Sequence, residues 1–193
     1  MVVRAEAPSV QELANRAHAL VPALKERAAR TEALRRIPSE TIEDLKQAGL
    51  FRIYQPARYG GFEMDYGPAQ MEICSALGRA CGATAWVLSV VACHSWMLGM
   101  FPERAQDAAW RDDPLAIASA AFSPISGKVR AVPGGYELEG EWAFASGIDN
   151  AEWAMLLAPM PDHVPPKRYF FLLPRQDFEL SLIHISEPTR QAE

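Results

Sequence analysis

The chain has 193 residues, 49% of them hydrophobic and 22% charged, a balance that is typical of globular proteins and excludes a disordered chain. Its formal net charge of -5 at pH 7 argues against nucleic-acid binding, because that affinity comes largely from clustered Lys and Arg. The three cysteines (Cys74, Cys81 and Cys93) form no CxxC pair, and the N-terminus has no apolar signal segment. We therefore expect a cytoplasmic protein.

The first hundred residues have the apolar spacing of helices. Ser9 and Glu12 fit a capping box at the start of the first helix, and Pro22 is expected to kink this helix or to begin a second segment. Ser39 is the expected N-cap of the next helix, which Gly49 should end.

Residues 80–102 contain no Asp, Glu, Lys or Arg, and an uncharged run of this length could span a bilayer. Its glycine, serine, threonine, cysteine and histidine residues lower the mean hydropathy, and the flanking charges give weak orientation cues. A buried core helix is the favoured interpretation. A membrane span stays open as the alternative.

Short strand-like segments replace the helices from Pro114 onward. They are rich in β-branched or aromatic residues, are separated by turn signals such as Pro133-Gly134-Gly135, and cover residues 115–122, 127–132, 136–144, 152–158 and 168–174. Helices followed by strands predict an α+β fold. We expect an N-terminal α-helical domain over residues 1–112 and a partial middle β domain over residues 113–179.

Two later segments are expected to lie outside the core. The Pro-rich residues 159–168 favour an exposed loop. Residues 180–190, "LSLIHISEPTR", resemble the translation of a sequencing-adapter oligonucleotide, so we expect residues 180–193 to be a non-native tail. His184 in this tail should therefore have no functional role.

Motifs for metal, phosphate or acyl-transfer chemistry are absent from the sequence. The four histidines have no ligand partners at helical spacing, and the chain has no HExxH, GxGxxG, GxxxxGKS or GxSxG pattern. We expect no metal site.

His94 is the remaining candidate within the uncharged segment. Trp86, Val90 and His94 are spaced at i, i+4 and i+8, which places an aromatic side chain and a titratable ring on one helix face. Largely apolar surfaces with a few polar groups are typical of ligand sites. The alternative is a core histidine whose hydrogen bonds are satisfied. Ser119 is a second isolated polar residue, and a hydroxyl bonded to neighbouring backbone is its alternative.

The segment "GEWAFASGID", residues 140–149, breaks from bulky strand residues into Ala145-Ser146-Gly147. Ser-Gly after a strand is common in turns. A flat ligand with a polar edge lying against the turn is the functional interpretation.

Three segments in this order, residues 34–65, 81–110 and 119–153, resemble the oxygenase component of two-component flavin-dependent aromatic monooxygenases. YGGFE, the helix from Trp86 to His94, GGYELEGEW and FASGID carry the resemblance in combination, over roughly residues 9–179. The similarity is to the branch that hydroxylates 3-hydroxy-seco-steroid phenols and 4-hydroxyphenylacetate. It implies the acyl-CoA dehydrogenase fold, whose C-terminal four-helix domain we expect to be missing here.

This resemblance also implies the reaction and the partners. The full-length protein would hydroxylate a phenolic or other aromatic substrate through a flavin C4a-hydroperoxide, using FMNH2 or FADH2 with O2 as co-substrate. A separate NAD(P)H-dependent flavin reductase would supply the cofactor, the assembly would be a homotetramer, and neither nucleic acid nor membrane would be bound. The uncharged helix would keep water from the flavin. Without the C-terminal domain, the chain is expected to bind flavin weakly and to turn over poorly.

Site residues follow from the same resemblance. Ser146 would be catalytic at the reactive flavin edge, and His94 would help to deprotonate the phenol while contacting it together with Ser119. The flavin would contact the remaining residues: Trp86, Phe122, Ser123, Phe144 and Ser146. Residues 122–124 read FSP where acyl-CoA dehydrogenases have TEP, and the missing acid favours a monooxygenase. An acyl-CoA dehydrogenase-like flavin dehydrogenase or oxidase, and a non-enzymatic helical or membrane-associated module, remain the alternatives.

Overall fold

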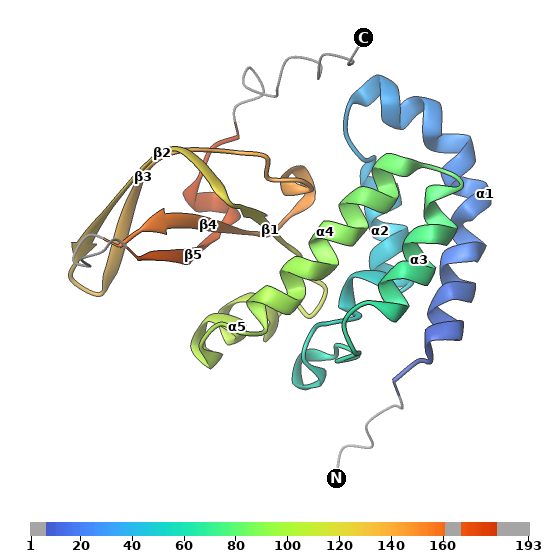
Figure 1. Ribbon diagram of the computed structural model, residues 1–193, viewed down its shortest axis with the longest axis horizontal. Coiled ribbons are helices and arrows are strands. Elements are labelled where there is room, and N and C mark those ends of the chain that lie inside the picture. The colour runs from blue at the N-terminus through green and yellow to red at the C-terminus, as the bar shows by residue number, and fades with distance from the viewer. Residues whose placement is uncertain (1–6, 161–166, 181–193) are drawn as a thin grey trace.

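The computed structural model describes residues 7–160 and 167–180, and it separates a helical half from a half made of strands (Figure 1). Residues 161–166 of the Pro-rich segment, and all of the tail after residue 180, lie outside the described residues. The helices come first in the chain: α1 (Val10–Leu34), α2 (Ser39–Gln47), α3 (Pro68–Gly78), α4 (Gly82–Leu98) and α5 (Glu103–Trp110).

Two sheets follow the helices. The order in the first is β1 (Ala118–Ala121), β4 (Trp153–Pro159) and β5 (Arg168–Pro174), with β1 parallel and β5 antiparallel to β4. The second is a hairpin of β2 (Ser123–Val132) and β3 (Gly135–Ala143), which Trp142 fastens to β4 by donating its indole N–H to the Leu157 carbonyl at 2.8 Å. The α+β prediction is confirmed.

The ends of the first two helices test the expected caps. The capping box is confirmed, because the Ser9 hydroxyl accepts the Glu12 N–H at 3.2 Å and the Glu12 carboxylate accepts the Ser9 N–H at 2.6 Å. Gly49 follows α2 with a φ of 76°, as expected for a helix stop. Ser39 is not the N-cap of α2, because the Pro38 carbonyl already accepts the first helical N–H groups.

Pro22 lies inside α1, which continues as one helix to Leu34, so no second segment begins there. Proline removes a single hydrogen bond from the ladder. Buried residues on both sides of it, including Leu13, Ala17 and Leu24, hold the helix against the core. The second segment is therefore excluded, and the kink stays a prediction.

The uncharged segment forms α4, which the structure places in the protein core. Its side chains Leu88, Val91 and Ala92 are at most 1% exposed, and the helix packs against α3 on one side and β1 on the other. Within residues 7–160 and 167–180, no helix is long and apolar enough to cross a membrane. The core-helix prediction is confirmed.

An ion pair joins the helical half to the first strand. Lys46 of α2 lies 2.7 Å from a Glu152 carboxylate oxygen, and the other oxygen of Glu152 accepts the Ile117 N–H at 2.7 Å. Because Ile117 directly precedes β1, this carboxylate fixes the beginning of β1 against α2.

The turn after β3 approaches α4 at Gly147. Gly147 has a φ of 82°, and a Cβ at this position would lie 2.9 Å from the Val91 side chain and 3.3 Å from the Val87 side chain. Only glycine satisfies both the backbone angle and this contact. Gly134 has a similar φ of 87°, but nothing lies within 4 Å of its Cβ position.

We predict that Gly147→Ala lowers the free energy of unfolding by about 2–4 kcal/mol, since it combines left-handed strain with overpacking. The matched Gly134→Ala should lower the free energy of unfolding by only about 1–2 kcal/mol, because it introduces left-handed backbone strain without overpacking. Urea denaturation of both variants measures the difference. Equal losses would contradict the close contact with α4.

Candidate functional site

Three of the residues expected at the site, from three separate elements, meet at the turn after β3. The Trp86 indole N–H of α4 donates to the Ser146 hydroxyl oxygen at 3.3 Å. The Ser119 hydroxyl of β1 donates to the Ser146 backbone carbonyl at 2.9 Å. Ser146 is thus held through its side chain by the helix and through its backbone by the strand.

Exposed aromatic side chains accompany this hydroxyl. Phe144, two residues before Ser146, is 81% exposed and has a φ of 62°, a left-handed conformation that is rare for a bulky residue. Trp86 is 61% exposed although it bonds to Ser146. Backbone strain beside exposed aromatic rings is a feature of ligand sites, and it costs about 1–2 kcal/mol that local packing must offset.

His94 lies on the same helix, two turns after Trp86, and is 5% exposed. Its Nδ1 accepts the Ala120 N–H of β1 at 3.1 Å. The Phe122 ring is centred 6.3 Å from the imidazole and packs edge to face on Phe170 of β5, with ring centres 5.0 Å apart. Ser123, which begins β2, is exposed beside Phe122.

Burial lowers the pKa of His94 to about 4, against a smaller opposite effect of a hydrogen bond with the Ala118 backbone. The ring is therefore neutral at pH 7. Because Nδ1 accepts a backbone N–H, the proton of the neutral ring is on Nε2. The Nε2–H is then the donor of the neutral ring, and the Ala118 backbone is a partner for it, because a backbone hydrogen bond that raises the pKa is one that the imidazole donates.

The structure brings the expected residues together in two linked groups. Trp86, Ser119 and Ser146 are joined by hydrogen bonds, and His94 with Phe122 lies next to them because Ala120 follows Ser119 in β1. Ser119 itself is 0% exposed, and its hydroxyl bonds to backbone, which is the alternative considered for this residue.

Two groups that contribute to the site have no signature in the sequence. Phe170 supports Phe122, yet it lies within a uniformly apolar strand that gives no sign of its partner. The Ala120 N–H fixes the His94 tautomer, and a backbone group carries no sequence signal. Both contacts depend on how β1, β5 and α4 are placed relative to one another.

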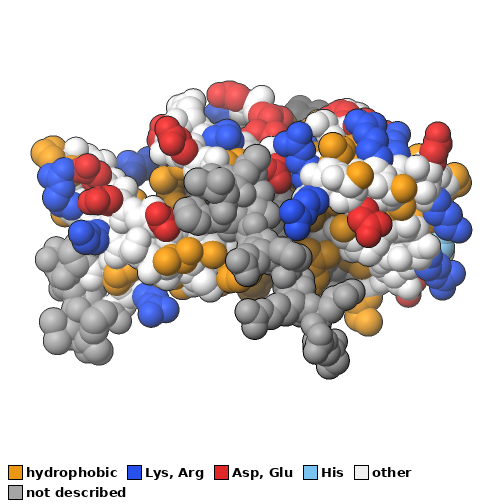
Figure 2. Space-filling model, turned by 90° about the horizontal axis from the view of Figure 1, so that it is seen from above, with side chains coloured by type: hydrophobic (Ala, Val, Ile, Leu, Met, Phe, Trp, Pro, Cys, Tyr) orange, Lys and Arg blue, Asp and Glu red, His pale blue; other side chains and the backbone are white. Residues whose placement is uncertain are grey.

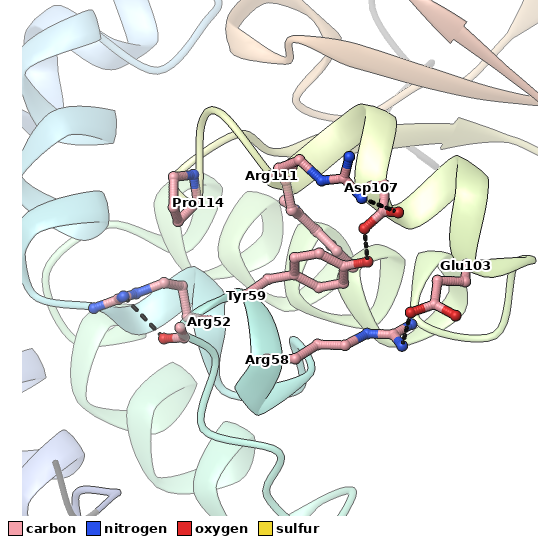
Figure 3. Close-up of a pocket in the computed structure, with 9 residues that line it drawn as sticks. Arg52, Arg58, Tyr59, Glu103, Asp107, Arg111 and Pro114 are labelled. Carbon is pink, nitrogen blue, oxygen red and sulfur yellow. Dashed lines mark hydrogen bonds and ion pairs between the residues drawn. The ribbon is translucent and has the colours of Figure 1, made fainter. Parts of the chain in front are cut away.

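A groove of about 620 Å³ lies elsewhere, at the short helix η2 (Ala57–Tyr59) and α5, and none of the expected site residues lines it (Figure 3). Four of its charged side chains are paired: Arg58 lies 2.9 Å from Glu103, and Arg111 pairs with Asp107. The Tyr59 hydroxyl also donates to Asp107 at 2.6 Å, whereas Arg52 donates to the Gly60 carbonyl at 2.9 Å. We interpret the contacts of Arg58 and Tyr59 as fastening η2 to α5.

Within residues 7–160 and 167–180, no group of three His, Cys, Asp or Glu residues is arranged to hold a metal ion. On the face shown in Figure 2, acidic and basic side chains are interspersed over the described residues.

Residues 8–113 match the family described as acyl-CoA dehydrogenase, N-terminal domain, and the chain belongs to this family. This family covers the helical half, which positions Trp86 and His94.

Among curated proteins, the chain is similar to the flavin-dependent monooxygenase oxygenase subunit HsaA of Rhodococcus jostii, with 40% identity over 86% of this chain and 43% of that protein. It is also 40% identical to the oxygenase component of p-hydroxyphenylacetate 3-hydroxylase from Acinetobacter baumannii, over 83% of this chain and 38% of that protein. The chain therefore spans less than half the length of these relatives.

Solved structures have the same arrangement of helices and strands as this chain. The crystal structure of 3-HSA hydroxylase from Rhodococcus sp. RHA1 superposes with a TM-score of 0.82 and 37% identity, over 88% of this chain and 44% of that chain. XiaF from Streptomyces sp., solved with FADH2 and glycerol, has a TM-score of 0.80 and 30% identity, over 87% of this chain and 42% of that chain. The expected acyl-CoA dehydrogenase-like fold is confirmed for this part of the chain.

The low pKa of His94 predicts a pH-dependent stability. Between pH 6.5, the ordinary imidazole pKa, and about pH 4, the unfolded state binds a proton that the folded state does not. The stabilisation by the neutral ring is present above pH 6.5 and is lost as pH falls, by about 1.4 kcal/mol per pH unit and about 3 kcal/mol in all.

The matched variant for this titration is His94→Asn, whose Oδ1 can still accept the Ala120 N–H. Urea denaturation between pH 7 and pH 4 should give a stability difference between wild type and variant that narrows or reverses as pH falls. Parallel curves would show that His94 does not titrate with a lowered pKa.

Proposed function

We propose that the full-length protein is the oxygenase component of a two-component flavin-dependent monooxygenase that hydroxylates a phenolic or other aromatic substrate. The observation that carries the proposal is the Ser146 hydroxyl, held by Trp86 of the uncharged α4 among exposed aromatic side chains. The similarity to oxygenase subunits of flavin-dependent hydroxylases supports it.

The residues at this turn fit a reduced flavin. A flat heteroaromatic ring needs apolar side chains against its faces and a hydrogen-bonding group at its edge. Trp86, Phe122 and Phe144 are exposed apolar side chains that could contact the ring, and Ser146 could bond to its edge. Ser123 would complete the cofactor contacts. The proposal includes both FMNH2 and FADH2 as the cofactor.

The bound flavin would activate O2 and supply the oxygen atom that is inserted into the substrate. The part of this chain in that chemistry is to hold the Ser146 hydroxyl in place and to exclude water. α4 has no charged side chain to hydrate, and Gly147 lets the turn close directly onto Val91.

His94 would act on the substrate as a neutral hydrogen-bond donor. If Nε2–H exchanged its bond to the Ala118 backbone for the substrate, it would stabilise a phenolate oxygen and so favour loss of the phenolic proton, which makes the ring more electron-rich. In this proposal, His94 assists deprotonation by stabilising its product, because Nδ1 already accepts the Ala120 N–H. Ser119 would contact the substrate only if its bond to the Ser146 carbonyl were exchanged.

The proposal also includes a partner protein, an assembly and a cellular location. A separate NAD(P)H-dependent reductase would supply the reduced flavin, consistent with the words "oxygenase subunit" in the names of relatives. The homotetramer, the residue 112/113 domain division and a cytoplasmic location belong to the same proposal. The three free cysteines favour a reducing compartment.

We predict that the full-length protein, supplied with reduced FMN or FAD and a panel of phenols, consumes O2 and forms an equivalent amount of hydroxylated product. His94→Ala should lower the product formed per O2 consumed by about tenfold or more, because the phenolate loses its donor. Oxygen-electrode traces and product chromatography measure both quantities.

The control is the exposed His18→Ala, which should leave the coupling unchanged. Unaltered coupling in His94→Ala would remove His94 from the reaction. Reduction of bound flavin by an acyl-CoA without a reductase would instead support an acyl-CoA dehydrogenase-like activity.

A further inference from the structure

We infer that Trp86 is a positioning residue: its indole N–H fixes the Ser146 hydroxyl so that this hydroxyl meets the edge of a planar nitrogen heterocycle. The inference rests on the proposed function and refines it. It assigns to Trp86 a role through Ser146, in addition to the apolar wall that its ring provides.

The Ser146 hydroxyl has hydrogen-bonding capacity beyond its bond to Trp86. A serine hydroxyl has one proton and two lone pairs. Trp86 occupies one lone pair at 3.3 Å. The proton and the second lone pair then remain for a ligand, and they point away from the indole.

The turn at Ser146 is held by contacts with both β1 and α4. Ser119 donates to the Ser146 carbonyl at 2.9 Å, and Gly147 lies so close to Val87 and Val91 that even a Cβ would not fit. The backbone of Ser146 and of Gly147 is therefore fixed. The side-chain rotamer is the freedom left to Ser146, and the indole N–H restricts it.

Residue 86 has a polar atom that an aromatic wall does not require. An aromatic wall alone could be built from phenylalanine, which has no N–H group. The chain instead has a tryptophan that is 61% exposed, and its polar atom faces the hydroxyl of the turn. Although the ring is exposed, its indole N–H donates to the hydroxyl of a site residue.

The hydrogen bond is tested first without any ligand, in the 193-residue chain labelled with 15N at its five tryptophans. Ser146→Ala should shift the indole resonance of Trp86, which is assigned by its loss in Trp86→Phe. The indoles of Trp110 and Trp142 bond to the backbone carbonyls of Ala116 and Leu157, and they serve as controls that should not move. An unmoved Trp86 resonance would overturn the inference.

The positioning role is tested next by a double-mutant cycle on flavin affinity in the full-length protein. Trp86→Phe and Ser146→Ala should each weaken binding of reduced FMN or FAD by about tenfold, and the double variant should be no weaker than the worse single variant. Replacing Trp86 by 3-benzothienylalanine keeps the ring but removes the N–H, and it should reproduce the loss. Additive losses, or full affinity with benzothienylalanine, would overturn the positioning role.

The two measurements separate this inference from the proposed function. Wild-type protein that binds neither FMN nor FAD, reduced or oxidised, would overturn the proposed function and the ligand-directed role together. The indole resonance, measured in the absence of flavin, decides independently whether Trp86 holds the Ser146 hydroxyl.

Discussion

The close approach of the turn at Ala145-Ser146-Gly147 to α4 is the contact on which the candidate site depends. Gly147 removes the side chain that would hold the turn away from Val87 and Val91. This approach brings the Ser146 hydroxyl within reach of the Trp86 indole. The helical half and the sheet half thus contribute to one site because a single residue has no Cβ.

The absence of charge in α4 links several properties of the site. A helix without Lys, Arg, Asp or Glu can be buried between α3 and β1 with little desolvation cost. The same surroundings lower the pKa of His94 to about 4, because burial disfavours the imidazolium. A neutral ring with its proton on Nε2 follows from burial together with the Ala120 N–H.

The first strand is fixed near both of its ends by polar contacts. Glu152 connects the Ile117 N–H to Lys46 of α2 just before β1 begins. Within β1, the Ser119 hydroxyl holds the turn and the Ala120 N–H holds the His94 ring. Hydrogen bonds to buried or partly buried groups are costly to leave unmade, so this strand has a defined position between the turn and α4.

The sequence by itself determined the helix-then-strand order, the capping box at Ser9, the stop at Gly49 and the burial of the uncharged segment, because these follow from local spacing and composition. It misplaced the cap of α2, where backbone bonding outweighs propensity, and it left open whether Pro22 kinks or divides α1, which core packing keeps as one helix. Only the tertiary structure decided that Trp86 bonds to Ser146 and that Ser119 bonds to backbone. Those partners are 60 and 27 residues apart in the chain, and no local pattern encodes a contact that forms only when a helix and two strands pack together.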